Sequence, residues 1–172
     1  MTDNNFKRIE QTNKNLIEFH QMMIDTHYTH KLKCCNTKED LVKGRFQWHY
    51  TDRALHQKWV SYNNQSKAIK FLIMDIDNGH MSLEEIDKEV NYKLKGLKPN
   101  WILQSDKGYH VGFIIPTFYP NEIDKVNSFI KIQQNLLNIL NADSNAIRLD
   151  GIWRNPFAHA MKFNIETFKL DD

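Results

Sequence analysis

The first third of the chain switches between a helical pattern and polar stretches. Apolar residues recur three or four positions apart over residues 6–24, which predicts an amphipathic first helix. Residues 26–44 lose this pattern and hold more Lys and Arg than Asp and Glu, so we expect a mildly basic loop. Polar and aromatic residues alternate over residues 45–50, as in a half-buried strand, and a short capped helix is predicted over residues 51–62.

The strongest strand signal is the dense apolar run at residues 68–74. Because this run is short and is followed by Asp-Ile-Asp-Asn-Gly, it predicts a central strand that ends at a turn. Ser82 and Glu85 then match the capping box, a side-chain pair that begins many helices. The helix predicted from this box runs toward Gly96 and ends before Pro99.

A hairpin and a long helix are predicted next. Residues 101–104 and 109–118 are expected to form two strands joined by the turn at residues 105–108. Apolar periodicity over residues 126–141 predicts a long amphipathic helix, and residues 143–168 hold short strand-like pieces. Together these elements predict an α+β fold with a mixed or largely antiparallel central sheet flanked by helices.

The composition is that of a globular domain with no strong excess of charge. The chain has 172 residues, of which 41% are hydrophobic and 26% are charged, values that disfavour disorder and fibrous repeats. Lys and Arg number 23 against 21 Asp and Glu, which leaves a net charge of +2. Any nucleic-acid site must therefore be local, because the surface as a whole is nearly neutral.

The cysteines and the lack of long apolar segments indicate the cellular compartment in which the protein is expected. Cys34 and Cys35 are adjacent and so are poorly placed for a disulfide, which favours a reducing environment. No signal peptide and no apolar run of membrane-spanning length is found, so we expect a cytoplasmic protein. His27 and His30 with the two cysteines offer four zinc ligands, but adjacent cysteines fit the usual zinc spacing poorly.

Asp75 and Asp77 are two positions apart where the predicted central strand ends. Side chains two apart on a strand point to the same face, so both carboxylates are predicted to lie together. Their repulsion is tolerated when both are hydrated or when a divalent cation lies between them, and their oxygens suit Mg²⁺ or Mn²⁺. Taken alone, the pair fits a hydrated strand end as well as a metal site.

Further candidate residues follow in the second half of the chain. Lys107 and His110 lie at the predicted hairpin and can donate hydrogen bonds to a phosphate beside Gly108. After the long helix come one more carboxylate and three donors that suit phosphates or a sugar: Asp143, Arg148, Arg154 and Asn155. Each also has an ordinary structural role, such as a core histidine, a helix-end aspartate or an ion-paired arginine.

The aromatic residues around position 50 leave two interpretations open. Their rings can stack on nucleobases, although packing in the core is the more common role: Phe46, Trp48, Tyr50 and Trp59. A Walker-type loop, a dinucleotide fingerprint, a His-Glu-x-x-His helix and a Gly-x-Ser-x-Gly elbow are all missing from the sequence.

The order of the acidic and histidine motifs resembles the archaeo-eukaryotic primase superfamily. An apolar strand ending in Asp75-Ile-Asp77, then Gly108-Tyr-His110, and then Ala-Asp143 after a helix follow one another as in that superfamily. Within it the chain looks most like the plasmid replication-initiator, or replicase, family of primases. The similarity spans roughly residues 31–163, and its further segments are Lys31 to Asn36, Pro99-Asn100, and Gly151-Ile-Trp-Arg154-Asn155-Pro156 with His159 beyond.

This resemblance implies that the chain makes a short primer by template-directed nucleotidyl transfer at a plasmid origin. The implied fold is a primase-polymerase core with an RNA-recognition-like half. We expect one catalytic domain over residues 1–172, with a helix and basic loop over 1–44 and the catalytic core over 45–172. The family's C-terminal DNA-binding domain is expected to lie outside this chain.

The resemblance also implies roles for individual residues and partners. The catalytic set is Asp75, Asp77, His110 and Asp143, and its three aspartates would hold Mg²⁺ or Mn²⁺. Asp150 is the alternate third ligand, because the chain is slightly longer than the family pattern there. The implied nucleotide-binding residues are Ser105, Lys107, Gly108, His110, Arg148, Arg154 and Asn155. Nucleoside triphosphates would be the substrates, single-stranded or origin DNA the template, and a host DNA polymerase or further initiator domains the partners.

Two other functions remain compatible with the same residues. A nucleic-acid-binding module can keep the fold and lose catalysis, in which case the carboxylates need not hold metal. A metal-dependent nuclease can use the same acids to cleave DNA without any nucleoside triphosphate.

Overall fold

The computed structural model describes most of the chain from residue 30 to residue 155. The described residues are 14, 17–19, 21–23, 25–26, 30–54, 56–64, 66–105, 107–144, 149, 151–155 and 161–163, with the backbone alone for 51, 52 and 161–163. Those between residues 14 and 26 are helical, in agreement with the first predicted helix.

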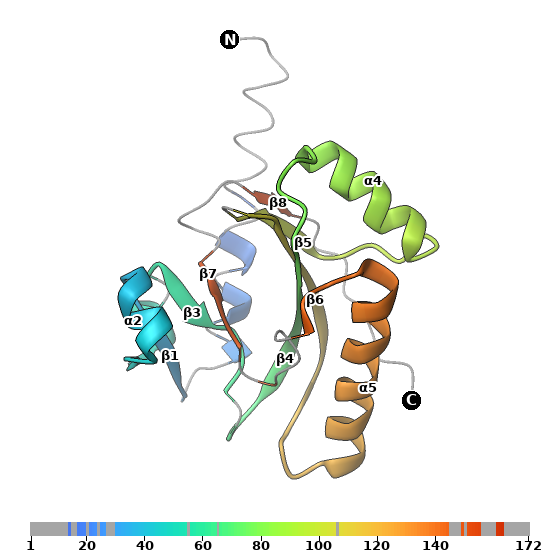
Figure 1. Ribbon diagram of the computed structural model, residues 1–172. Coiled ribbons are helices and arrows are strands. Elements are labelled where there is room, and N and C mark those ends of the chain that lie inside the picture. The colour runs from blue at the N-terminus through green and yellow to red at the C-terminus, as the bar shows by residue number, and fades with distance from the viewer. Residues whose placement is uncertain are drawn as a thin grey trace.

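Four short strands form a first antiparallel sheet (Figure 1). They are β1 (Lys31–Cys35), β2 (Gln47–Tyr50), β3 (Trp59–Ser61) and β7 (Ile152–Arg154), in the order β2-β1-β3-β7. β2 confirms the strand predicted from the alternation of polar and aromatic residues. Its Trp48 and Tyr50 are about half exposed, so core packing is wrong as an expectation for these two rings.

The basic loop expected over residues 26–44 is wrong, because this segment contains β1 and a helix. Helix α2 (Lys38–Lys43) begins after Thr37, whose side chain accepts a hydrogen bond from the Asp40 amide, and ends at Gly44 with φ at 66°. β1 has partners on both sides, β2 and β3, and all of them lie later in the chain. The pattern of residues within β1 therefore gives little indication that the segment is a strand.

The helix expected over residues 51–62 is also wrong beyond its first turn. Helix α3 (Thr51–Ala54) is a single turn, and the chain then enters β3. Trp59 pairs with Cys35 of β1 on one side and with Arg154 of β7 on the other. These interstrand hydrogen bonds override the local helical preference.

A second antiparallel sheet carries most of the predicted strands. β4 (Ile69–Ile76), β5 (Trp101–Gln104), β6 (Tyr109–Phe118) and β8 (Met161–Phe163) lie in the order β4-β6-β5-β8. β5 and β6 form the predicted hairpin. The α+β class and the antiparallel pairing are confirmed, but the described strands form two sheets where one central sheet was expected.

β4 lies at the edge of the described sheet and not at its centre, as its apolar run had suggested. Both faces of this strand are nevertheless buried. Phe71 and Ile73 pack toward the first sheet, whereas Leu72 and Met74 pack toward the helices on the other side. Burial on two faces explains the dense apolar run without a second neighbouring strand.

Helices α4 (Leu83–Lys93) and α5 (Ile123–Leu140) cover the outer face of the second sheet (Figure 1). The predicted capping box is present: the Ser82 hydroxyl accepts from the Glu85 amide, and the Glu85 carboxylate accepts from the Ser82 amide. α5 ends at Asn141, whose φ is 54°. No helix in the described part of the chain is long and apolar enough to span a membrane.

Two hydrophobic cores hold these layers together. The outer core joins α4 and α5 to the second sheet through Ile86, Val90, Phe129, Leu136, Leu72, Met74, Val111 and Phe113. The inner core fills the space between the two sheets and includes Phe19, Met23, Leu32, Val60, Tyr62, Phe71 and Trp101. The inner core therefore fixes the first sheet against the face of the second sheet on which Asp75 and His110 lie.

Candidate active site

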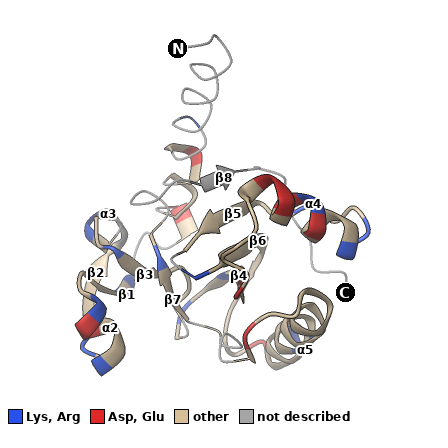
Figure 2. Cartoon of the chain, turned by 45° about the horizontal axis from the view of Figure 1, so that its top comes forward, with Lys and Arg blue, Asp and Glu red and all other residues tan. Residues whose placement is uncertain are grey.

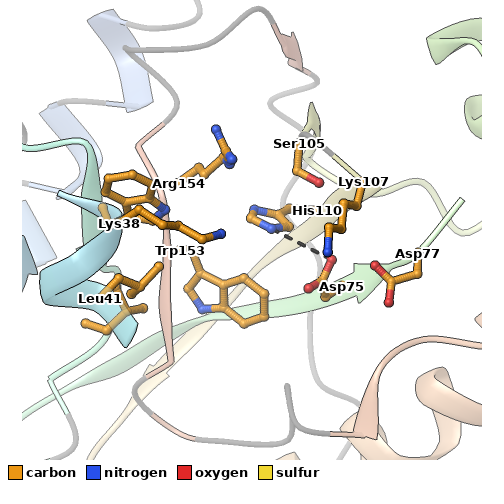
Figure 3. A pocket seen from close by; sticks show the side chains of 11 residues that line it. Lys38, Leu41, Asp75, Asp77, Ser105, Lys107, His110, Trp153 and Arg154 are labelled. Carbon is orange, nitrogen blue, oxygen red and sulfur yellow. Dashed lines mark ion pairs between the residues drawn. The ribbon is translucent and has the colours of Figure 1, made fainter. Parts of the chain in front are cut away.

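A pocket of about 260 Å³ opens where the first sheet meets the second (Figure 3). From α2, β3 and β7 it is lined by Lys38, Leu41, Trp59, Ile152, Trp153 and Arg154. From β4, β6 and the turn before β6 it is lined by Asp75, Asp77, Ser105, Lys107 and His110. The structure thus brings together seven of the residues singled out in the sequence, from four separate stretches of chain.

Asp75 continues the inner face of β4 toward the pocket, and Asp77 follows directly after the strand ends. Phe71 and Ile73 occupy the preceding positions of this face and are buried in the inner core. Both carboxylates line the pocket together, as their spacing predicted. The Asp75 side chain is 30% exposed, and Asp77 is more open to solvent.

His110 lies directly across from Asp75 in the pairing of β6 with β4. Its Nε2 atom is 3.8 Å from Oδ1 of Asp75 (Figure 3). The imidazole also packs edge-on against the indole of Trp153, with ring centroids 5.1 Å apart. The His110 ring is 10% exposed, so the sheet and Trp153 together hold it in a fixed position.

Asp143, in the loop after α5, does not line the pocket but is hydrogen-bonded to Asp75 through its backbone. Its backbone amide donates a 2.8 Å hydrogen bond to the carbonyl oxygen of Asp75. Burial and the nearby carboxylates of Asp77 and Asp143 raise the pKa of Asp75 from 3.8 to about 6. The three aspartates therefore form one cluster of interacting negative charge.

The turn before β6 is shaped by Ser105 and Gly108. The Ser105 amide donates to the Gly108 carbonyl at 2.8 Å, and the Gly108 amide donates to the Ser105 hydroxyl at 3.1 Å. A Cβ atom at Gly108 would lie 1.8 Å from the carbonyl oxygen of Ile76. Gly108 thus lets the turn approach β4, and the side chains of this turn that line the pocket are those of Ser105 and Lys107.

Positive charge lies on the side of the pocket opposite the aspartates. Lys38 and Arg154 project into the pocket from α2 and β7 (Figure 3). The Arg154 guanidinium carbon lies 5.7 Å from the ring centroid of Trp59. The pocket therefore has an acidic wall on the second sheet and a basic, aromatic wall on the first.

Sequence reasoning did not find several residues of the basic wall: Lys38, Leu41, Ile152 and Trp153. Lys38 and Leu41 belong to α2, in a segment expected to be a loop, so no pattern connected them to a site. Trp153 does lie in the Gly-Ile-Trp-Arg segment that carried the family resemblance. Its position in this segment could have marked Trp153 as a site residue, but only Arg154 and Asn155 of the segment were expected to bind the nucleotide.

Asn155 lies beside the pocket and does not line it. Its side chain is buried and donates to the carbonyl of Gln57 at 2.8 Å, while its amide donates to the carbonyl of Lys58 at 2.8 Å. These bonds tie the end of β7 to the segment before β3, which holds Arg154 and Trp59 together. Arg148 and Asp150 lie outside the described residues.

The cysteines lie apart from this pocket. Cys34 and Cys35 are buried free thiols, and burial raises the pKa of both, that of Cys34 to about 11. A protonated thiol is a poor zinc ligand. His27, the first of the four zinc ligands considered in the sequence, lies outside the described residues.

The aspartate cluster offers the donors that a hard divalent cation prefers. All three side chains are carboxylates, and burial together with the neighbouring carboxylates raises the pKa of Asp75, a cost that a bound cation would relieve. Among the described residues, no three His, Cys, Asp or Glu side chains are already arranged as a ligand set. The donor chemistry thus fits Mg²⁺ or Mn²⁺, and side-chain rotation or a bound phosphate would have to complete the coordination.

Comparison with known proteins supplies the family. None of the curated proteins or solved structures searched matches the chain. One family model, that of the Replicase family, matches residues 25–172. The match includes every residue of the pocket and both walls described above. On this evidence, the chain belongs to the Replicase family.

Proposed function

We infer that this chain is a DNA-directed primase, or primase-polymerase, domain of a plasmid-type replication initiator. It would join nucleotides into a short primer on a DNA template. Membership of the Replicase family indicates a role in replication. The observation that carries the finer proposal is the division of one pocket into an acidic wall and a basic wall.

The acidic wall fits the metal requirement of nucleotidyl transfer. Asp75, Asp77 and Asp143 would hold divalent cations. When bound, such ions activate the attacking hydroxyl and neutralise the pyrophosphate that leaves. The part of the protein would be to bring the three carboxylates to one metal site: Asp75 ends the inner face of β4, Asp77 follows the strand, and the backbone of Asp143 is hydrogen-bonded to that of Asp75.

The basic wall fits the substrate's phosphates. Lys38 and Arg154 on one side and Lys107 on the other can donate charge-assisted hydrogen bonds to triphosphate oxygens. His110 lies between these walls, against Asp75 and Trp153, where it can donate to a phosphate oxygen. Each donor comes from a regular element or a tight turn, so the phosphates would meet a largely preformed site.

Primer synthesis by the purified chain tests this proposal. The assay contains labelled nucleoside triphosphates, a single-stranded template, and Mg²⁺ or Mn²⁺, with oligonucleotide products separated by length. We expect Asp75→Asn and Asp77→Asn to reduce product by about 100-fold or more, because an interaction made in the transition state is lost. Asp124→Asn, at an exposed position in the first turn of α5, is the matched control and should keep full activity.

The same assay separates the two alternative functions. Release of nucleotides from labelled DNA without any triphosphate, lost in Asp75→Asn, would identify a nuclease instead of a primase. Tight DNA binding with no product and no response to Asp75→Asn would identify a binding module. Either result contradicts the proposed synthesis.

A further inference from the structure

Strands β1 and β2 of the first sheet bear side chains on one face that are open to solvent. Lys31 is the partner of Tyr50, and Lys33 is the partner of Trp48, in the pairing of β1 with β2. Directly paired residues point to the same side of a sheet, so these four side chains share a face. The other face of the same sheet bears Leu32, Cys34 and Val60, which are fully buried in the inner core.

Aromatic rings and lysines alternate across this outer face. The tyrosine and tryptophan side chains are 54% and 49% exposed. The Lys31 ammonium lies 5.3 Å from the ring centroid of Tyr50, and the Lys33 ammonium lies 5.5 Å from that of Phe46. We refer to Lys31, Lys33, Phe46, Trp48 and Tyr50 as the aromatic–basic face.

Charge on this sheet is of one sign. Strands β1, β2, β3 and β7 contain no Asp or Glu, in contrast to the acidic first turn of α4 (Figure 2). Acids close to these strands in the sequence are Asp52, two residues after the end of β2, and Glu39 and Asp40 of α2. Glu39 is ion-paired with Lys43 and Arg45, and Asp40 with Arg45. The four strands themselves therefore offer only cations to a polyanion, and both acids of α2 are ion-paired.

The aromatic–basic face and part of the pocket lie on the same side of the first sheet. Trp59 is paired with Cys35 and with Arg154, so its ring lies on the same side of the sheet as Lys33. Both Trp59 and Arg154 line the pocket. This side of the sheet thus carries the aromatic–basic face on β1 and β2 and, beyond the buried Cys35, two residues of the basic wall of the candidate active site.

We propose that the aromatic–basic face binds single-stranded DNA and guides the template toward the pocket. Unpaired bases stack on exposed rings, whichever base is present, and lysines beside the rings neutralise the phosphates. Duplex DNA keeps its bases stacked inside the helix and cannot use the rings in this way. The proposal rests on the proposed function, because it identifies the strand that the pocket would copy.

Fluorescence anisotropy of a labelled single strand of mixed sequence measures this binding directly. The full chain is used without metal or nucleoside triphosphate, so that the result does not depend on synthesis. We expect Trp48→Ala and Tyr50→Ala each to weaken binding by about fivefold or more. Trp48→Phe, which keeps an aromatic ring, should retain most of the affinity.

The lysines are tested through the salt dependence of the same binding. A lysine that contacts a phosphate of a single strand contributes about 0.7 to the slope of log affinity against log salt concentration. Lys31→Gln and Lys33→Gln should each reduce the slope by about this amount. The matched controls are Tyr92→Ala on α4, whose ring is 85% exposed, and Lys131→Gln on α5, which is also exposed. Neither control should change affinity or slope.

Several outcomes would overturn the proposal. Unchanged single-strand affinity in both Trp48→Ala and Tyr50→Ala, with thermal unfolding showing that the variants are folded, excludes the aromatic–basic face as the binding surface. Equal affinity for duplex and single strand excludes stacking on the rings. A dimer in analytical ultracentrifugation that Trp48→Ala dissociates would show that a second copy of the chain covers this face.

The proposed function and the template surface fail in different ways. If Asp75→Asn abolishes synthesis and the variants of the aromatic–basic face bind DNA like wild type, the proposed primase function is supported and the proposed template surface is contradicted. If these variants lose single-strand binding and the wild-type chain makes no primer, the proposed template surface is supported and the proposed primase function is contradicted.

Discussion

His110 and Asp75 are cross-strand partners, with Nε2 of the imidazole 3.8 Å from Oδ1 of the carboxylate. Their positions are set by the register of β6 on β4 and not by a flexible loop. Asp143 is also held at this position of β4, because its backbone amide donates a hydrogen bond to the Asp75 carbonyl oxygen. Anything that shifts this register therefore moves three of the candidate catalytic groups at once.

The charge of Asp75 should make the metal-free protein less stable as the pH rises. Its pKa is about 6 in the folded chain and near 3.8 when unperturbed, so the folded state holds the proton more tightly. The free energy of unfolding is then expected to fall between about pH 4 and pH 6, by up to about 3 kcal/mol, and to level off above. Urea unfolding with a chelator present, across this range, measures the loss.

Asp75→Asn provides the comparison for that pH dependence. The variant should be more stable than wild type above pH 6, because it carries no buried charge, and similar to it near pH 3.5. Added Mg²⁺ should stabilise wild type at pH 8 more than it stabilises the variant. A variant less stable than wild type at pH 8 without metal would contradict the raised pKa of Asp75.

Asn63 is expected to be a major structural residue between the two sheets. Its side-chain amide donates to the carbonyls of Phe71 and Leu149, and its side-chain oxygen accepts from the amides of Lys70 and Phe71. Asn63→Ala leaves these buried groups without partners and should lower the free energy of unfolding by about 2–4 kcal/mol. Asn91→Ala, at an exposed position on α4, should stay within about 0.5 kcal/mol of wild type in the same denaturation experiment.

Gly108→Ala should affect both stability and nucleotide binding. The new Cβ would meet the Ile76 carbonyl at 1.8 Å, so the turn must move away from β4. We expect a loss of about 1–3 kcal/mol in unfolding free energy and weaker binding of a triphosphate, since Lys107 moves with the turn. Ser105→Ala, which removes one hydrogen bond and adds no atom, should cost less in stability. Equal stability of Gly108→Ala and wild type would show that this close approach is not present in solution.

Neighbouring residues of β7 should separate substrate binding from structure. Arg154→Gln removes a cation from the pocket wall and should weaken triphosphate binding roughly tenfold, with little change in stability. Asn155→Ala removes the buried hydrogen bond to Gln57 and should lower stability by about 1–3 kcal/mol. Calorimetric titration and urea unfolding of both variants test the pair. The reverse pattern would assign Asn155 to the nucleotide and Arg154 to the scaffold.

Cys34 should be unreactive in the folded protein. Burial raises the pKa of its thiol to about 11, so almost none is thiolate at pH 8. We expect modification by a thiol reagent only when urea unfolds the chain. Because the unfolded thiol ionises near its ordinary pKa of 9, stability should fall between about pH 9 and pH 11, and Cys34→Ala should remove this part of the loss. Rapid labelling of Cys34 at pH 8 without urea would contradict its burial.

The strands and helices with the clearest local patterns could be predicted from the sequence. The apolar run of β4, the β5–β6 hairpin, the capping box of α4 and the periodicity of α5 each report a segment that buries one or two faces along its own length. The spacing of Asp75 and Asp77 belongs to this class, since alternation along a strand is a local property. So does the order of the motifs, which pointed to the replicase family.

Only the tertiary structure decided which distant residues meet. β1, β3 and β7 are three to five residues long, and their hydrogen-bond partners lie far along the chain, so local preference carries little information about them. The same long-range pairing brings Lys38 and Trp153 to the aspartates and turns Trp48 and Tyr50 outward. The sequence by itself determined the acids and their order, because these follow from patterns within single segments. The basic wall and the exposed aromatic face exist only because two sheets pack against each other.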